Sequence, residues 1–222
     1  MSTRHFAASL LVGLLCATSS QAASVSFYLD QSNKLADGVN YLQVTIADGT
    51  DGAIDFTVTA LQPLLDMADE GFGIQRFAFN VIGGTATDRR DVTDLPDEWR
   101  ALNGGGMAGF GLFDMKLNSN GKNHRDPLTF SITGVDFDTI LSYVDLSTGH
   151  ARQGFSLFSA RVVGLNFGNC GSATDKGDKT CVESAFFGGT QAVPAPPAIW
   201  LLGTAVAALA GRRIRRARQG LP

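Results

Sequence analysis

The chain has 222 residues, of which 44% are hydrophobic and 18% are charged, and it contains 26 glycines. This composition fits one globular domain flanked by short extra segments and excludes a fibrous or disordered chain. All 21 acidic residues lie between Asp30 and Glu183, together with 12 of the 18 basic ones, so the central part carries a net charge of −9. Such an acidic body argues against nucleic-acid binding, which requires a basic face.

The first 22 residues have the pattern of a secretory signal peptide. Arg4 and His5 make a weakly basic start, an apolar run covers residues 6–18, and the small residues Ser20 and Ala22 stand where a signal peptidase reads the chain. We therefore expect the secretion machinery to export the chain and signal peptidase to cleave it after Ala22.

Residues 23–192 mostly alternate between apolar and polar side chains with a period of two, as strands with one buried face do. Turn signals such as Asp37-Gly38 and Asn120-Gly121 separate the runs. This pattern predicts an all-β domain, an antiparallel β-sandwich of jelly-roll or Ig-like type, with a core filled mainly by phenylalanine. The expected strands are 25–29, 42–46, 54–60, 77–81, 113–117, 128–132 and 155–163, with helical turns at 61–68 and 137–144.

A glycine-rich stretch follows the fourth expected strand. Gly104, Gly106 and Gly109 form a G-x-G-x-x-G match. In dinucleotide-binding proteins these glycines follow a strand and open a helix, but the glycines here are too dense for a helix. We interpret the stretch as a flexible glycine loop between strands.

Three amide side chains close to a turn are the candidate metal ligands. Calcium takes six to eight oxygen ligands, and Asn118, Asn120 and Asn123 bring amide oxygens together around Gly121. The stretch lacks the downstream bidentate glutamate of a full calcium loop, and asparagine is a common turn residue without any metal. We therefore expect no cofactor, with calcium as the alternative.

The acidic stretch 88–99 is expected to be a solvated loop that ends in an aromatic residue. Trp99, beside Arg100, could stack on a sugar ring in a carbohydrate-binding module, or it could pack beneath the loop. No nucleophile motif is present, and the glutamates show no local pattern for the paired carboxylates of glycoside hydrolysis. The sequence therefore favours a non-enzymatic protein. The alternatives are a calcium-assisted carbohydrate-binding module and a carbohydrate-active enzyme.

Two cysteines remain after removal of the signal peptide, Cys170 and Cys181. Because the chain is expected to enter an oxidising compartment, we predict a disulfide between them. The polar, glycine-containing segment between them would otherwise be poorly constrained. The disulfide is expected to be a structural crosslink.

The C-terminal segment has three parts in a fixed order. The motif Val193-Pro194-Ala195-Pro196-Pro197 precedes the uncharged residues 198–211, and five arginines follow: Arg212, Arg213, Arg215, Arg216 and Arg218. At ~1.5 Å per residue a helix over 198–211 would span only about 21 Å, but a helix over about 197–214 with snorkelling arginines can reach across a bilayer. The arginines predict stop transfer with this end in the cytoplasm and the acidic body outside it.

The run VPAPPAIWLLGTAVAALAGRRIRR resembles the PEP-CTERM sorting signal, although Ala195 stands where that family usually has glutamate. The resemblance implies recognition by an exosortase, a membrane transpeptidase of Gram-negative bacteria, and an association with exopolysaccharide or biofilm. It therefore implies an inner-membrane anchor with the body in the periplasm, then transfer to the cell surface or matrix. The expected organisation is a signal peptide at 1–22, a β-sandwich at 23–192 and a sorting signal at 193–218.

Overall fold

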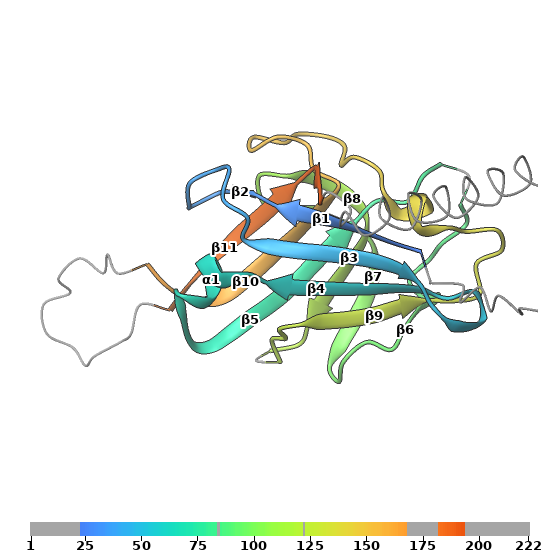
Figure 1. Ribbon diagram of the computed structural model, residues 1–222, viewed down its shortest axis with the longest axis horizontal. Coiled ribbons are helices and arrows are strands. Elements are labelled where there is room, and N and C mark those ends of the chain that lie inside the picture. The colour runs from blue at the N-terminus through green and yellow to red at the C-terminus, as the bar shows by residue number, and fades with distance from the viewer. Residues whose placement is uncertain (1–22, 84, 122, 168–181, 194–222) are drawn as a thin grey trace, which may run out of the picture.

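The computed structural model describes residues 23–83, 85–121, 123–167 and 182–193, which form an all-β sandwich of two six-stranded antiparallel sheets (Figure 1). Sheet A has the order β12-β1-β3-β4-β9-β6, and sheet B has the order β2-β11-β10-β5-β8-β7. The strands of sheet A are β1 (Ser24–Leu29), β3 (Leu42–Asp48), β4 (Ile54–Ala60), β6 (Val92–Thr93), β9 (Leu128–Ile132) and β12 (Gln191–Ala192). Those of sheet B are β2 (Gln31–Ser32), β5 (Ala68–Phe79), β7 (Trp99–Met107), β8 (Gly111–Ser119), β10 (Phe158–Asn166) and β11 (Val182–Gly189).

The short helical elements lie in the connections between strands. They are η1 (Thr50–Gly52), α1 (Gln62–Leu65) and η2 (Ile140–Tyr143). The last two confirm the helical turns predicted from the sequence. η2 begins with a capping box, in which the backbone N–H of Thr139 donates a hydrogen bond to the Ser142 hydroxyl at 3.1 Å.

The alternation predicted from the sequence produces the buried face of each sheet. In β3, for example, the side chains of Leu42, Val44 and Ile46 are fully buried, whereas the residues between them are partly exposed. Strands β1, β3, β4, β8 and β9 contain the predicted runs in full, and β10 begins three residues later than predicted. The all-β antiparallel sandwich is thus confirmed.

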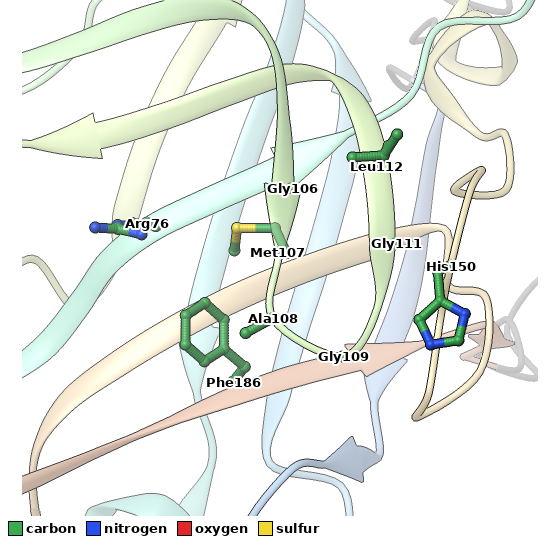
Figure 2. Close-up of a pocket in the computed structure, with 9 residues that line it drawn as sticks. All are labelled: Arg76, Gly106, Met107, Ala108, Gly109, Gly111, Leu112, His150 and Phe186. Atoms are coloured by element: carbon green, nitrogen blue, oxygen red, sulfur yellow. The ribbon is translucent and has the colours of Figure 1, made fainter.

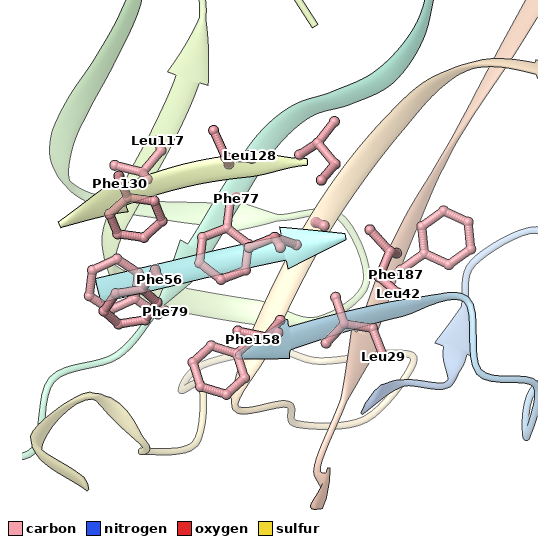
Figure 3. Close-up of a cluster of buried hydrophobic side chains, with 14 of the residues drawn as sticks. Leu29, Leu42, Phe56, Phe77, Phe79, Leu117, Leu128, Phe130, Phe158 and Phe187 are labelled. Carbon is pink, nitrogen blue, oxygen red and sulfur yellow. The ribbon is translucent and has the colours of Figure 1, made fainter. Parts of the chain in front are cut away.

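Stacked phenylalanine rings fill the space between the sheets (Figure 3). Phe56 of β4 lies at the centre of the cluster, with its ring centroid 4.7 Å from that of Phe130 and 5.2 Å from that of Phe79. Phe77 and Phe158 continue the cluster along sheet B, with their centroids 6.1 Å apart. All five rings are at most 2% exposed, and this aromatic core lies within a larger cluster of buried aliphatic side chains between the two sheets.

The glycine-rich stretch lies in a strand, so its interpretation as a flexible loop is wrong. Gly104, Gly105 and Gly106 belong to β7, which pairs with β8 from Trp99↔Ser119 to Met107↔Gly111. Only Ala108–Phe110 form the turn. Glycine suits this strand at position 104, where φ is 74°, a left-handed conformation that other residues rarely adopt.

The described body begins and ends on neighbouring strands of sheet A. β12 is antiparallel to β1, with Ala192 opposite Phe27, and the Val193 N–H donates to the Ser26 carbonyl at 2.8 Å. Val193, the last described residue, therefore lies at the end of the sheet where β1 begins after Ala23. Of the helices in the described ranges, none is long and apolar enough to cross a membrane.

Candidate functional site

The hairpin between β7 and β8 folds over the outer face of sheet B, the face turned away from the aromatic core (Figure 2). Ala78 belongs to that outer face because its neighbours Phe77 and Phe79 point into the core. A second buried cluster forms on it from Ala78, Met107, Phe110 and Phe113. The tip of the hairpin is thus held down by its own apolar side chains.

A glycine in β11 makes the close approach of the hairpin possible. A Cβ on Gly188 would lie 2.4 Å from the ring of Phe110, which is fully buried. Only hydrogen at this position lets the ring lie against the strand. The sequence feature that allows the hairpin to lie here is therefore Gly188 near the end of β11.

The hairpin borders an open pocket of about 550 Å³. Its apolar wall comes from Met107, Ala108, Leu112 and Phe186, whereas Arg76 and His150 are its ionisable lining residues. Figure 2 shows these two on opposite sides of the hairpin. The pocket therefore combines an apolar wall with basic groups, on a body whose net charge is −9.

Three arginines and an asparagine line up across sheet B in one row, which we call the arginine rung: Arg161, Arg76, Asn118 and Arg100. The strand register pairs Arg161 with Arg76, Arg76 with Asn118, and Asn118 with Arg100. Each lies next to a residue that is packed in or against the core, so the rung faces outward. On the far side of Arg161, Phe186 of β11 continues the row.

The rung lacks a carboxylate partner within the described ranges. The salt bridge found within those ranges joins Lys34 to Glu183 at 2.5 Å and involves none of the three arginines. Arg161 donates from Nη2 to the Ser184 hydroxyl at 3.0 Å, and its guanidinium lies 5.6 Å from the centre of the Phe186 ring. Burial, and then the positive charge of Arg76, lower the pKa of Arg161.

Two polar atoms of the rung are buried without a hydrogen-bond partner among the described residues: Nε of Arg161 and Oδ1 of Asn118. Buried polar atoms are normally paired, and each exception calls for an explanation. The orphaned donor, the three arginines without a carboxylate partner in the described part of the chain, and the open pocket beside them can bind an anionic group. This is the candidate functional site.

Trp99, the predicted sugar-stacking residue, lies in the core instead. It is only 8% exposed, and its indole N–H donates to the Asn123 carbonyl at 2.8 Å. Its ring therefore has no free face for a sugar in this structure. Packing beneath the preceding stretch, the other role considered for Trp99, is the one that the structure shows.

The three asparagines of the calcium hypothesis take different roles. The Asn123 amide donates to Glu98 Oε2 at 2.7 Å, and the Asn120 N–H donates to the Glu98 carbonyl at 2.8 Å. Asn118 lies between Arg76 and Arg100, whose positive charges oppose a bound cation. No group of three or more His, Cys, Asp or Glu in the described ranges is placed to hold a metal ion.

The arginine rung was missed in the sequence because alternation reveals the face of one strand and not its neighbours. Arg161 stands between the core residues Ala160 and Val162, and this places it on the outer face. Its alignment with Arg76, which lies 85 positions earlier in the sequence, depends on the register of β10 and β5.

The remaining predicted residues lie outside the described ranges. These are the signal peptide, Cys170 and Cys181, the proline motif after Val193, and the helix and arginines of the C-terminal segment. Neither a protein-family model, nor a curated protein, nor a solved structure matches this chain.

Proposed function

We propose that this chain is an exported, non-enzymatic surface or extracellular-matrix protein, held in the inner membrane by its C-terminal segment until an exosortase processes it. The order of proline motif, uncharged run and arginine cluster over residues 193–218 carries this proposal. A cleaved signal peptide at 1–22 and a short transmembrane helix at about 197–214 complete it. The finer fold assignment, jelly-roll or Ig-like, belongs to the same proposal.

The way the body ends supports a tethered domain. The Val193 N–H makes the final hydrogen bond of β12 with β1, and the next residue, Pro194, has no N–H with which to extend the ladder. Proline favours a stiff, extended chain, and Pro196 and Pro197 follow in the sequence. Such a segment separates the folded body from the membrane and gives a processing enzyme an accessible stretch of chain.

Cell fractionation of a secreting Gram-negative host tests the proposal. The full chain is compared with a chain that stops after Val193, and with a variant in which the five C-terminal arginines become glutamine. A lysine version of the same five positions keeps the charge and serves as the matched control. We expect the full chain and the lysine variant in the membrane and surface fractions, and the shortened chain free in the periplasm.

The glutamine variant is expected to lose retention because stop transfer depends on positive charge. Deleting the host's exosortase should trap the full chain in the inner membrane. The same distribution for the full and shortened chains would contradict membrane anchoring. Unchanged surface delivery without the exosortase would contradict the processing step alone.

A further inference from the structure

We propose that the outer face of sheet B binds an acidic polysaccharide, with Arg161, Arg76 and Arg100 contacting its carboxylate groups and the neighbouring pocket contacting its sugar rings. The proposal depends on the folded body alone and is independent of membrane anchoring and processing. It places glycan recognition at residues other than Trp99 and requires no calcium.

The positive charges of the rung favour a bound anion, and the described part of the chain does not supply one. Arg161 and Arg76 are directly opposite each other on adjacent strands, which lie ~4.8 Å apart, and like charges in such pairs repel. Among the described residues, Arg161 Nε has no acceptor, although it is buried. A carboxylate between the two guanidinium groups would remove the repulsion and accept hydrogen bonds from both, since arginine binds carboxylates through its planar fork.

The length of the rung indicates a polymer rather than a single small anion. From Arg161 on β10 to Arg100 on β7 the row crosses three strand spacings, or about 14 Å. A chain of sugars carrying carboxylates at intervals can contact both ends of such a row. Binding at several sites of one chain also raises the overall affinity beyond that of any single contact.

The surroundings favour an acidic polysaccharide over a nucleic acid. The body carries a net charge of −9, which repels a densely charged polyanion, whereas one carboxylate per sugar unit is tolerated more easily. Beside the rung, the partly exposed Phe186 and the exposed Leu112 offer apolar contact surface in the pocket. The C–H faces of sugar rings can pack there while their carboxylates meet the arginines.

Binding of the purified full chain in mild detergent to polygalacturonate tests the proposal. Methyl-esterified polygalacturonate has the same backbone without the charge, and a DNA duplex of similar length provides a dense polyanion. The test variant is Arg76→Gln with Arg161→Gln. The matched control is Arg89→Gln with Arg90→Gln, which removes the same charge from two exposed residues outside the rung.

We expect binding to polygalacturonate that weakens as ionic strength rises, with no binding to the methyl ester. The test variant should bind at least tenfold more weakly, because two charge-assisted contacts are lost, and the control should change less than threefold. Circular dichroism verifies folding. If the test variant does not fold, Arg100→Gln at an exposed position replaces it, with an expected loss of about threefold or more.

Equal binding of the methyl ester, or equal losses in the test and control variants, would overturn the proposal. Tighter binding to the DNA duplex would overturn it as well, in favour of a general polyanion site. Absence of binding to polygalacturonate at low salt would also refute it.

Discussion

Replacing Phe56 by alanine should be among the most destabilising single changes in the aromatic core. Phe56 is 1% exposed and lies between the two sheets. Its ring stacks on Phe130 at 4.7 Å and on Phe79 at 5.2 Å between centroids, and it meets the edge of Tyr143 at 5.8 Å. Alanine would remove three aromatic contacts at once and leave a cavity between the sheets.

The expected loss follows from these contacts. Truncation of a buried phenylalanine to alanine costs about 3–5 kcal/mol, through lost burial and the cavity that remains. The three ring contacts place Phe56 near the middle of that range or above it, at about 4 kcal/mol. In a domain of this size that corresponds to a fall in melting temperature of roughly 8–16 °C. Phe56→Leu keeps most of the apolar volume and should lose only about 1–2 kcal/mol.

Urea unfolding followed by near-ultraviolet circular dichroism measures the change, with the buried ring of Trp99 among the reporters. Phe137→Ala is the matched control, because Phe137 is fully exposed and its truncation should change the free energy of unfolding by less than about 0.5 kcal/mol. If Phe56→Ala and the control differ by less than about 1 kcal/mol, the aromatic core does not hold the sheets together.

Two further predictions concern the backbone and the pH dependence. In the same assay, Gly164→Ala should lower the free energy of unfolding by at least about 2 kcal/mol more than Gly121→Ala does. Both glycines have φ near 70°. A Cβ at position 164 would lie 2.4 Å from the Phe72 backbone, whereas a Cβ at position 121 would meet nothing within 4 Å. Burial, and then the hydrogen bond to Asp138, raise the pKa of Tyr143 in the folded protein. As the pH rises, this tyrosine therefore loses its proton in the unfolded chain before it does so in the folded one. The free energy of unfolding should consequently fall as the pH rises above about 10. Tyr143→Phe should reduce that fall; an identical pH profile in both proteins would contradict the assignment.

The fold class could be predicted because the alternation of apolar and polar residues within each amphipathic strand shows which of its side chains are buried. The runs at 42–46, 54–60 and 128–132 alternate cleanly, and they became β3, β4 and β9. The predicted strand at 77–81 overlaps only the end of β5, which begins at Ala68 and ends at Phe79. Gly71 and Gly73 interrupt the alternation there, and pairing with β10 through register shifts, rather than local preference, keeps this segment extended.

Elsewhere, the structure depends on tertiary contacts that the local sequence does not reveal. β7 is a strand despite three consecutive glycines because its backbone pairs with β8 along its whole length. The same limit applies to the candidate site. The individual arginines are visible in the sequence, but the register that aligns Arg161 with Arg76 and Asn118 arises only when the sheet forms. Trp99 had two possible roles because its burial depends on contacts that the local pattern does not contain.

The intact mass of the protein recovered from the cell-surface and medium fractions of its native host tests the central claim most directly. The proposed route predicts a mass that lacks residues 1–22 and everything beyond the 193–197 segment. A protein that keeps its C-terminal arginines and occurs only in the inner membrane would contradict exosortase processing and leave a membrane-anchored periplasmic domain.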